Sequence, residues 1–132
     1  MQALLNDYSA YLDEQSIHYY ARDGFSVSFE MPHIAHVLIN VLATSDDISI
    51  WEYIALSDTG PRDANRLLKK LRARYPQYHF QKDHYTSYEI SVSDRFPFSS
   101  VEHLHERICA LTSVVDDCYV IGKEIPGDRF HR

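Results

Sequence analysis

The order in which hydrophobic periodicities follow one another is the feature that most limits what this chain can fold into. The first segment has helical spacing and predicts a helix over about Gln2–Gln15. Segments with a period of two residues come next, and two more segments with helical spacing follow later. Helices interleaved with strands that short turns connect predict an α+β fold, an antiparallel sheet with helices packed against it. The apolar residues of the first helix are Leu4, Leu5, Tyr8, Tyr11 and Leu12.

Two strands are expected directly after this helix, because Asp23–Gly24 is a dipeptide typical of two-residue hairpin turns. The strands should cover Ile17–Arg22 and Phe25–Met31. The second of them alternates cleanly between apolar and polar residues, so one of its faces should be buried.

A third strand is expected over His33–Ala43, after Pro32, and a turn over Thr44–Asp47 should lead to a fourth strand over Ile48–Leu56. The third strand is unusual because it is apolar on one face and mixed on the other. Such a strand is either central or covered on its second face by a partner. The mixed face consists of Ile34, His36, Leu38, Asn40 and Leu42, and Trp51 and Tyr53 share one face of the fourth strand.

The second half of the chain predicts a helix, two strands and a final helix. Pro61 suits the first helical position after possible cap residues in Ser57–Gly60, and Pro76 should end that helix. Strands are expected over Tyr78–Lys82 and Tyr85–Ser93, around Asp83–His84. In the final helix, Ser99 and Glu102 have capping-box spacing, and Gly122 is the expected stop. The predicted order is α-β-β-β-β-α-β-β-α in a single domain, residues 1–125, with a polar tail, residues 126–132.

Charge and cysteine content limit the class of protein. A formal net charge of −6 argues against general affinity for nucleic acid or anionic membranes. Cys109 and Cys118 should lie roughly 13 Å apart along one helix, too far for a disulfide. No signal-peptide pattern follows Met1, and the longest apolar run is too short to cross a bilayer. We therefore expect a cytoplasmic protein with reduced thiols and without a nucleic-acid or membrane partner.

The order of elements resembles that of YbjN-like proteins, whose fold is that of type III secretion chaperones. The likeness covers about Leu4 to Val120, and its most suggestive segments are Leu4–Leu12 and the final helix, Phe98–Tyr119. The resemblance implies a dimeric, non-enzymatic protein that holds another polypeptide and has no catalytic residues. The chain departs from the family pattern in its many histidines and tyrosines and in the hairpin at Asp23–Gly24.

The histidines do not have the spacing of metal ligands. His33 and His36 should face opposite sides of a strand, and His103 and His105 should lie on different faces of a helix. No Cys-x-x-Cys or His-Glu-x-x-His pattern accompanies them. We expect no metal and no cofactor.

The sequence also contains no motif of catalytic nucleophiles or of acid–base residues. Cys109 lies near the apolar face of the final helix, and Cys118 lies beside Asp116–Asp117, which would oppose a thiolate. The carboxylate pairs Asp46–Asp47 and Asp116–Asp117 should serve turn formation and solvation. Since no glycine-rich phosphate loop or nucleophile elbow is present, we expect the protein not to be an enzyme.

Two surfaces are candidates for binding a partner protein. The middle helix carries six of the 13 basic residues and is either a solvated face or a contact for an acidic protein. The mixed face of the third strand, extended by the aromatic residues of the fourth, is either core or an interface. The residues expected to bind a partner are Ile34, His36, Leu38, Asn40, Trp51, Tyr53, Arg62, Arg66, Lys69 and Lys70.

These observations predict a protein-binding module, chaperone-like or adaptor-like, that forms a homodimer. Two alternatives remain. One is a small acidic immunity or inhibitor protein that neutralises a basic toxin or nuclease, since its charge would speed such an association. The other is an enzyme of a type that the sequence does not reveal.

Overall fold

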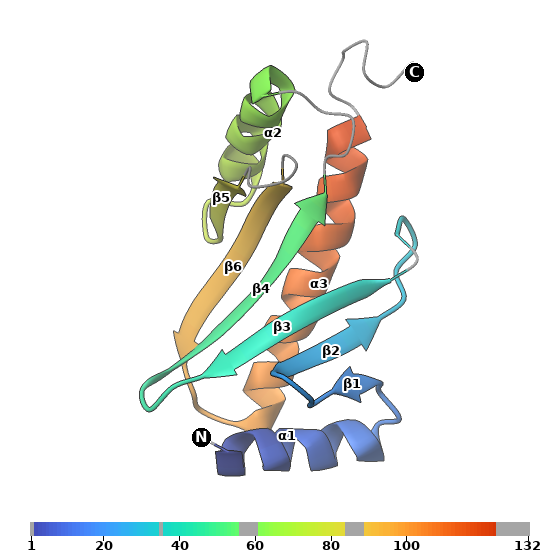
Figure 1. The fold of residues 1–132 in the computed structure, drawn as a ribbon, viewed down its shortest axis with the longest axis vertical. Helices are drawn as coiled ribbons and strands as arrows, with labels where there is room; N and C mark the ends of the chain where they lie inside the picture. Colours follow the sequence, from blue (N-terminus) through green and yellow to red (C-terminus); the bar gives the residue numbers. More distant parts are fainter. Residues whose placement is uncertain (1, 35, 56–60, 84–88, 124–132) are drawn as a thin grey trace.

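The structure, a computed structural model, describes residues 2–34, 36–55, 61–83 and 89–123 and confirms the predicted α+β fold and order of elements (Figure 1). Six antiparallel strands form one sheet in the order β1-β2-β3-β4-β6-β5. The expected cap residues before Pro61, the first four residues of the strand expected over Tyr85–Ser93, and the polar tail lie outside the described residues. The described part of that strand continues to Pro97, four residues beyond its expected end. The elements are α1 (Gln2–Glu14), β1 (Tyr19–Tyr20), β2 (Phe25–Phe29), β3 (Val37–Ala43), β4 (Asp47–Ala55), α2 (Pro61–Arg74), β5 (His79–Asp83), β6 (Glu89–Pro97) and α3 (Val101–Lys123).

The centre of the sheet is the ladder between β4 and β6. All nine residues of β4 pair with all nine of β6, from Asp47 opposite Pro97 to Ala55 opposite Glu89. The chain between these strands forms α2 and then β5, which pairs with the other side of β6 at the edge of the sheet. The two longest strands, β4 and β6, are therefore neighbours in the sheet although α2 and β5 lie between them in the sequence.

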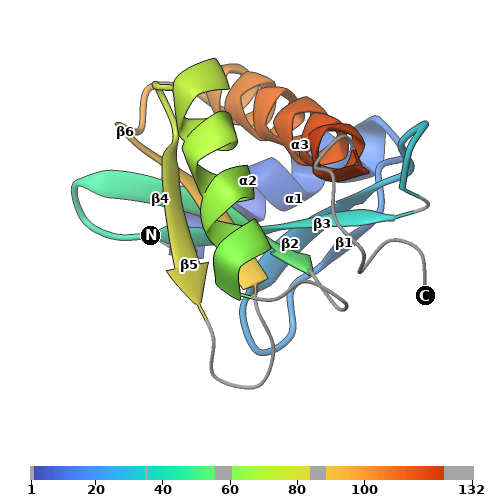
Figure 2. The same ribbon diagram turned by 90° about the horizontal axis from the view of Figure 1, so that it is seen from above.

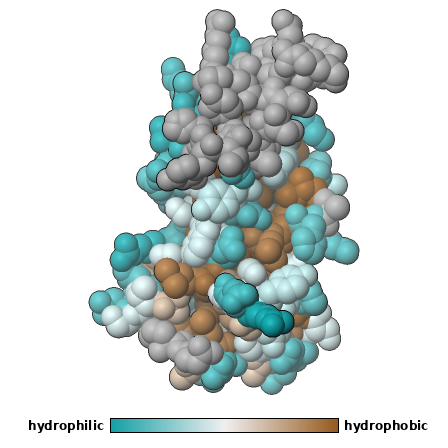
Figure 3. Space-filling view, in the orientation of Figure 1, coloured by the Kyte–Doolittle hydropathy of each residue, from teal (hydrophilic) through white to brown (hydrophobic). Residues whose placement is uncertain are grey.

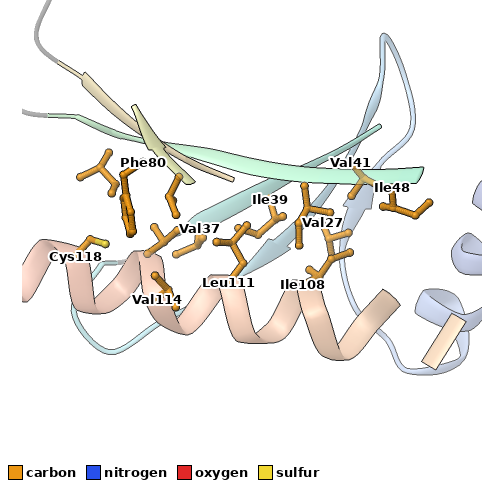
Figure 4. Packing of buried hydrophobic residues seen from close by; sticks show 14 of the residues in the cluster. Val27, Val37, Ile39, Val41, Ile48, Phe80, Ile108, Leu111, Val114 and Cys118 are labelled. Atoms are coloured by element: carbon orange, nitrogen blue, oxygen red, sulfur yellow. The ribbon is translucent and has the colours of Figure 1, made fainter. Parts of the chain in front are cut away.

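The hydrophobic core lies between one face of the sheet and the helices (Figure 2). Figure 4 shows Val27, Val37 and Ile39 of the sheet directed toward α3, which presents Ile108, Leu111 and Val114. Each fully buried aliphatic side chain of this kind stabilises the fold by about 1.5–3 kcal/mol. Both longer helices bury apolar residues at helical spacing here: Ala64, Leu67, Leu68 and Leu71 in α2, and Leu104, Ile108, Leu111 and Val115 in α3. Tyr75 and Val101 continue these two stripes as half-buried residues.

Strand β3 begins at Val37, four residues later than predicted. The expected strand residues His33 and Ile34 do not join the ladder, because their backbone N–H groups donate to Oδ1 of Asp116 at 2.9 and 3.1 Å. Ile34 consequently packs against the core as a half-buried residue and does not continue the mixed face of β3. From Val37 onward the predicted alternation holds, with Val37, Ile39 and Val41 buried in the core.

The first hairpin has a register one residue away from that of a two-residue turn. Tyr20 pairs with Ser26, whereas a loop of Asp23–Gly24 alone would pair Tyr20 with Val27. A shift of one residue exchanges the faces of a strand. The observed register turns Tyr19 inward, where its ring stacks on Phe25 with centroids 5.6 Å apart, and it turns Tyr20 outward.

Both ends of α3 differ from the sequence prediction. The helix begins at Val101, and the hydroxyl of Ser100, not that of Ser99, accepts a hydrogen bond of 3.0 Å from the N–H of His103. Gly122 does not stop the helix, which continues to Lys123. Gly122 lies against Leu67 of α2, so it marks a contact between two helices.

The described helices include none that is both long enough and apolar enough to cross a bilayer.

A partly buried ion pair joins α3 to the core face of β6. The guanidinium of Arg107 donates from Nε to Oδ2 and from Nη2 to Oδ1 of Asp94, both at 2.8 Å. The Asp94 side chain is only 8% exposed, and the guanidinium carbon lies 4.4 Å from the centroid of the Phe96 ring. The hydrogen bonds from Arg107 offset the free-energy cost of burying the Asp94 carboxylate at an inward position of β6.

Replacing Arg107 with alanine should lower the free energy of unfolding by about 2–3 kcal/mol, because Asp94 would be left buried without its partner. The double variant Arg107→Met and Asp94→Leu should recover most of this loss. The control is Arg95→Ala, which removes an exposed Arg95–Asp47 pair and should cost about 0–1 kcal/mol. Denaturant unfolding measures all three, and equal losses for the two arginine variants would contradict the argument.

Asp116 is a structural residue and does not serve solvation as predicted. Besides the two backbone N–H groups, its Oδ2 contacts Nδ1 of His33 at 2.7 Å, and the side chain is 8% exposed. Burial acts to raise the pKa of Asp116, but the hydrogen bonds from His33 and Ile34 outweigh it, so the pKa lies below its ordinary value. The carboxylate thus ties the segment before β3 to the C-terminal half of α3.

Asp116→Asn should destabilise the fold by about 1–3 kcal/mol at neutral pH, because a charged acceptor of these hydrogen bonds is lost. A carboxyl group whose pKa is lower in the folded state stabilises above its unfolded pKa and loses this effect as the pH falls. The stability difference between wild type and Asp116→Asn should therefore shrink below about pH 4. Urea unfolding between neutral and acidic pH tests this, with exposed Asp46→Asn as a control expected to change stability by less than about 0.5 kcal/mol. A difference independent of pH would refute the electrostatic role.

Candidate functional site: the open face of the sheet

One face of the sheet has no helix packed against it among the described residues. The helices α2 and α3 lie together on the other side (Figure 2), and the outward positions of the strands carry several exposed apolar side chains. Leu42 is 53% exposed, Tyr20 46% and Tyr53 43%. Figure 3 shows this face, with hydrophobic residues gathered over β3 and β4 between polar ones. Exposed apolar groups concentrated on one face are typical of an interaction surface.

A groove runs along β6 on this open face. Its depression of about 300 Å³ lies on the β4-β6-β5 part of the sheet. Ladder pairing explains its shape, because Trp51 lies opposite Ser93 and Tyr53 opposite Ser91, while Ser93 and Ser91 face His79 and Gln81 on the other side. Small serines on β6 thus form the floor, and larger side chains on β4 and β5 form the walls. We call this the serine groove, lined by Ser49, Trp51, Tyr53, His79, Gln81, Ser91, Ser93, Asp94 and Arg95.

Charge in the serine groove is balanced. The guanidinium of Arg95 contacts Oδ2 of Asp47 at 2.9 Å from both Nε and Nη2. Asp94 lines the groove but its carboxylate is held on the core side by Arg107. The groove therefore offers aromatic rings, hydroxyl groups and amide groups with little net charge, which suits an uncharged ligand better than an ionic one.

The β3 half of the open face is joined to the serine groove through Asn40. Asn40 lies opposite Trp51, and its side-chain amide donates to the Trp51 carbonyl at 3.2 Å. Leu38 lies farther along β3, and His36 lies just before the strand, where its imidazole contacts the Ser28 hydroxyl at 3.0 Å from Nε2. Outward residues of β3 and β4 that were predicted to bind a partner, except Ile34, therefore share one face.

The sheet divides next to this junction. Strands β3 and β4 pair only from Asn40–Trp51 to Ala43–Ile48, and beyond Asn40 and Trp51 they diverge (Figure 1). Glu52 fills the resulting sheet fork, because its Oε2 accepts the Leu38 N–H at 3.2 Å and its Oε1 accepts the Tyr53 N–H at 2.8 Å. Burial raises the pKa of Glu52, against the lowering effect of these two hydrogen bonds. A side chain thus satisfies backbone groups that a continuous ladder would have paired.

The basic residues of α2 lie on the opposite side of the molecule. Arg66, Lys69 and Lys70 are exposed, because the apolar stripe of α2 faces the core on the helix-covered side of the sheet. Arg72 and Arg74 are engaged, with the Phe80 carbonyl at 2.8 Å and with Asp117 at 3.1 Å. The side chain of Arg62 lies outside the described residues. The two predicted binding surfaces therefore do not form one site.

The cysteines lack the surroundings of a nucleophile. His105 links Tyr8 and Cys109, with 2.9 Å between the Tyr8 hydroxyl and Nδ1 and 3.4 Å between Sγ and Nε2. Burial raises the pKa of the Cys109 thiol and lowers that of His105, so both groups are held neutral. Burial, with a contribution from Asp117, raises the pKa of Cys118 to about 12. Both cysteines are free thiols, as predicted.

The histidines lie in separate environments. His33 contacts Asp116, His36 contacts Ser28, and His105 contacts Tyr8, while the ring of His103 packs edge-on against Phe96. No group of three or more potential metal ligands occurs among residues 2–34, 36–55, 61–83 and 89–123. The absence of a metal site in the whole protein stays a prediction.

Sequence reasoning identified Trp51 and Tyr53 but missed the rest of the serine groove. Ser91 and Ser93 alternate with Ile90 and Val92, a signal of a strand with one small polar face. That signal could not show that these serines lie between the aromatic residues of β4 and the polar residues of β5. The pairing of β4 with β6 was needed for this.

Comparisons with known proteins agree with this architecture. No protein-family model and no curated protein matches the chain. Among solved structures, an uncharacterised protein from Methanothermobacter thermautotrophicus is similar, with a TM-score of 0.63, 15% identity, and coverage of 95% of this chain and 99% of that one. YbjN from E. coli, provisionally named a transcription regulator, is similar with a TM-score of 0.65, 9% identity, and coverage of 90% of this chain and 89% of that one.

The fold is therefore that of a small α+β protein in which no described helix covers one face of the sheet. More specifically, it is a YbjN-like fold, which confirms the resemblance predicted from the order of elements.

Proposed function

We propose that this protein is a non-enzymatic module that binds another polypeptide and acts as a dimer, in the manner of a chaperone or adaptor. The observation that carries the proposal is the open face, where Tyr20, Leu42 and Tyr53 are between 43% and 53% exposed. The described part of the chain offers no activated nucleophile and no cluster of metal ligands that would favour an enzyme.

The β3 half of the open face fits a second copy of the chain. Its outward residues in the hairpin and in β3 include Tyr20, Ser26, Leu38, Asn40 and Leu42, none of which is charged. Two chains that each carry a net charge of −6 repel one another, so an uncharged surface is where they can approach most closely. A two-fold symmetric contact would bring this patch against itself.

The exposed bases of α2 fit an acidic protein. Arg66, Lys69 and Lys70 form a local positive surface on a chain that is otherwise strongly acidic. The acidic remainder would repel a nucleic-acid backbone, so a part in transcription of the kind suggested for YbjN would depend on protein contacts.

The wild-type protein should be a dimer of about twice the 15.4 kDa chain mass at micromolar concentration. Leu42→Ser should shift it toward the monomer, because the most exposed apolar side chain of the β3 half is lost. Tyr53→Ser is the matched control, since Tyr53 lies in the serine groove and should leave the dimer intact. Light scattering over a dilution series measures this. A wild-type monomer, or a dimer unaffected by Leu42→Ser, would contradict the proposed interface.

Lys69→Glu should weaken binding of an acidic partner and reduce the salt dependence of that binding, while folding should change by less than about 0.5 kcal/mol because Lys69 is exposed. Arg22→Glu makes the same change of charge in the β1–β2 hairpin and serves as the control. Partner profiles from affinity purification should differ for the first variant only. Identical profiles would leave α2 as a solvated face, and salt-sensitive binding of wild-type protein to mixed-sequence DNA or RNA would refute a purely protein-binding role.

A further inference from the structure

We propose that the serine groove binds a neutral pyranose sugar, with the sugar ring against Trp51 and Tyr53 and the sugar hydroxyl groups bonded to the polar lining. This site is separate from the two polypeptide-binding surfaces of the proposed function, the β3 half of the open face and the bases of α2, and it does not rest on them. Four features of the groove carry the inference: its size, its aromatic side chains, its hydroxyl and amide groups, and the pairing of its charged groups.

The groove has the size of a small-molecule site. Its volume of about 300 Å³ lies at the lower end of the roughly 300–1,000 Å³ that is usual for ligand pockets. Its walls rise from β4 and β5 on either side of β6, so the two wall backbones are roughly 9–10 Å apart. This width admits one non-planar ring. A polypeptide strand lying there would leave most of its backbone groups unpaired, because the strands beneath it already bond to one another.

Trp51 and Tyr53 offer ring surface to such a ligand. Tyr53 is 43% exposed, Trp51 is half-buried, and neither packs against another aromatic ring among the described residues. The face of an aromatic ring carries partial negative charge and attracts the weakly positive hydrogens of C–H groups. In a glucose-type pyranose the hydroxyl groups are equatorial, so they extend from the rim and leave C–H groups on both faces. One face can therefore contact the aromatic wall while the hydroxyl groups reach the floor and the opposite wall.

The polar lining can both donate and accept hydrogen bonds, as sugar hydroxyl groups do. The hydroxyls of Ser93 and Tyr53 form no hydrogen bond within the described part of the chain, and each can donate one proton and accept through its lone pairs. Ser91 donates to the Gln81 carbonyl at 3.4 Å and keeps its capacity to accept. The side-chain oxygen of Gln81 contacts Nε2 of His79 at 3.4 Å, so the Gln81 amide N–H groups remain to donate. A ligand with only donors or only acceptors would leave part of this lining unpaired, whereas a ring with several hydroxyl groups matches both.

The charged groups of the described lining already have partners. Arg95 contacts Asp47 at 2.9 Å, and the Asp94 carboxylate is bonded to Arg107 on the core side of the sheet. The whole chain has a formal net charge of −6. An acidic sugar, a sugar phosphate or a nucleotide would therefore meet repulsion that no unpaired arginine or lysine of the described lining offsets, whereas a neutral sugar would not.

The test titrates the full chain with sugars and follows the fluorescence of Trp51, the only tryptophan in the protein. Methyl β-glucoside should give a saturable change in emission at millimolar concentration, because a ligand with few atoms binds weakly. Sorbitol, which has the hydroxyl groups without the ring, should give no saturable change. Methyl β-glucuronide, which carries a carboxylate in place of one hydroxymethyl group, should bind about five- to tenfold more weakly than the glucoside. No saturable response to the glucoside, an equal response to sorbitol, or tighter binding of adenosine would each overturn the inference.

Two variants locate the sugar in the groove. Tyr53→Ser should weaken glucoside binding about five- to tenfold, because part of the aromatic wall is lost. Ser93→Leu fills the floor between Trp51 and His79 and should abolish binding, while urea unfolding stays cooperative. Phe98→Ser is the control, since it removes an exposed aromatic ring outside both the groove and the proposed dimer surface, and it should bind the glucoside as wild type does. Unchanged binding in the two groove variants, or an equal loss in Phe98→Ser, would show that the sugar does not occupy the groove.

Discussion

The packing of α3 across one face of the sheet is the interaction on which the rest of the structure depends. Its buried stripe contacts the inward residues of β3, β4 and β6, and α2 and α1 then pack beside it. Two polar anchors fix its placement: Arg107 on Asp94 near one end, and Asp116 on His33 and Ile34 near the other. Because this single layer of helices occupies one face of the sheet, no helix of the described residues covers the opposite face.

The open face is shaped by how the sheet is paired. A continuous ladder between β3 and β4 would have given one flat surface, but the strands separate past Asn40 and Trp51, and Glu52 closes the sheet fork with its carboxylate. The face therefore has two unlike halves. The β3 half carries exposed apolar side chains among uncharged polar ones, and the serine groove combines aromatic rings with hydroxyl and amide groups.

Sequence reasoning was most successful where one local pattern dominates. The order of elements, the apolar stripes of α2 and α3 and the inward residues of β3 follow from periodicity, and Pro61 begins α2 as predicted. It was wrong where a distant side chain competes with the local pattern. His33 and Ile34 have the pattern of strand residues, but their N–H groups donate to the Asp116 carboxylate. The cap of α3 was wrong by one residue for a local reason, because Ser100 and not Ser99 accepts the His103 N–H.

The sequence by itself thus determined the fold class, the buried faces and the aromatic pair Trp51 and Tyr53, because each depends on spacing along one segment. Only the tertiary structure decided which surfaces these residues join. It paired β4 with β6, which placed Ser91 and Ser93 between two walls, and it set the basic side chains of α2 on the other side of the sheet. Contacts between segments far apart in sequence are fixed by the packing of the whole core, and local periodicity carries no information about them.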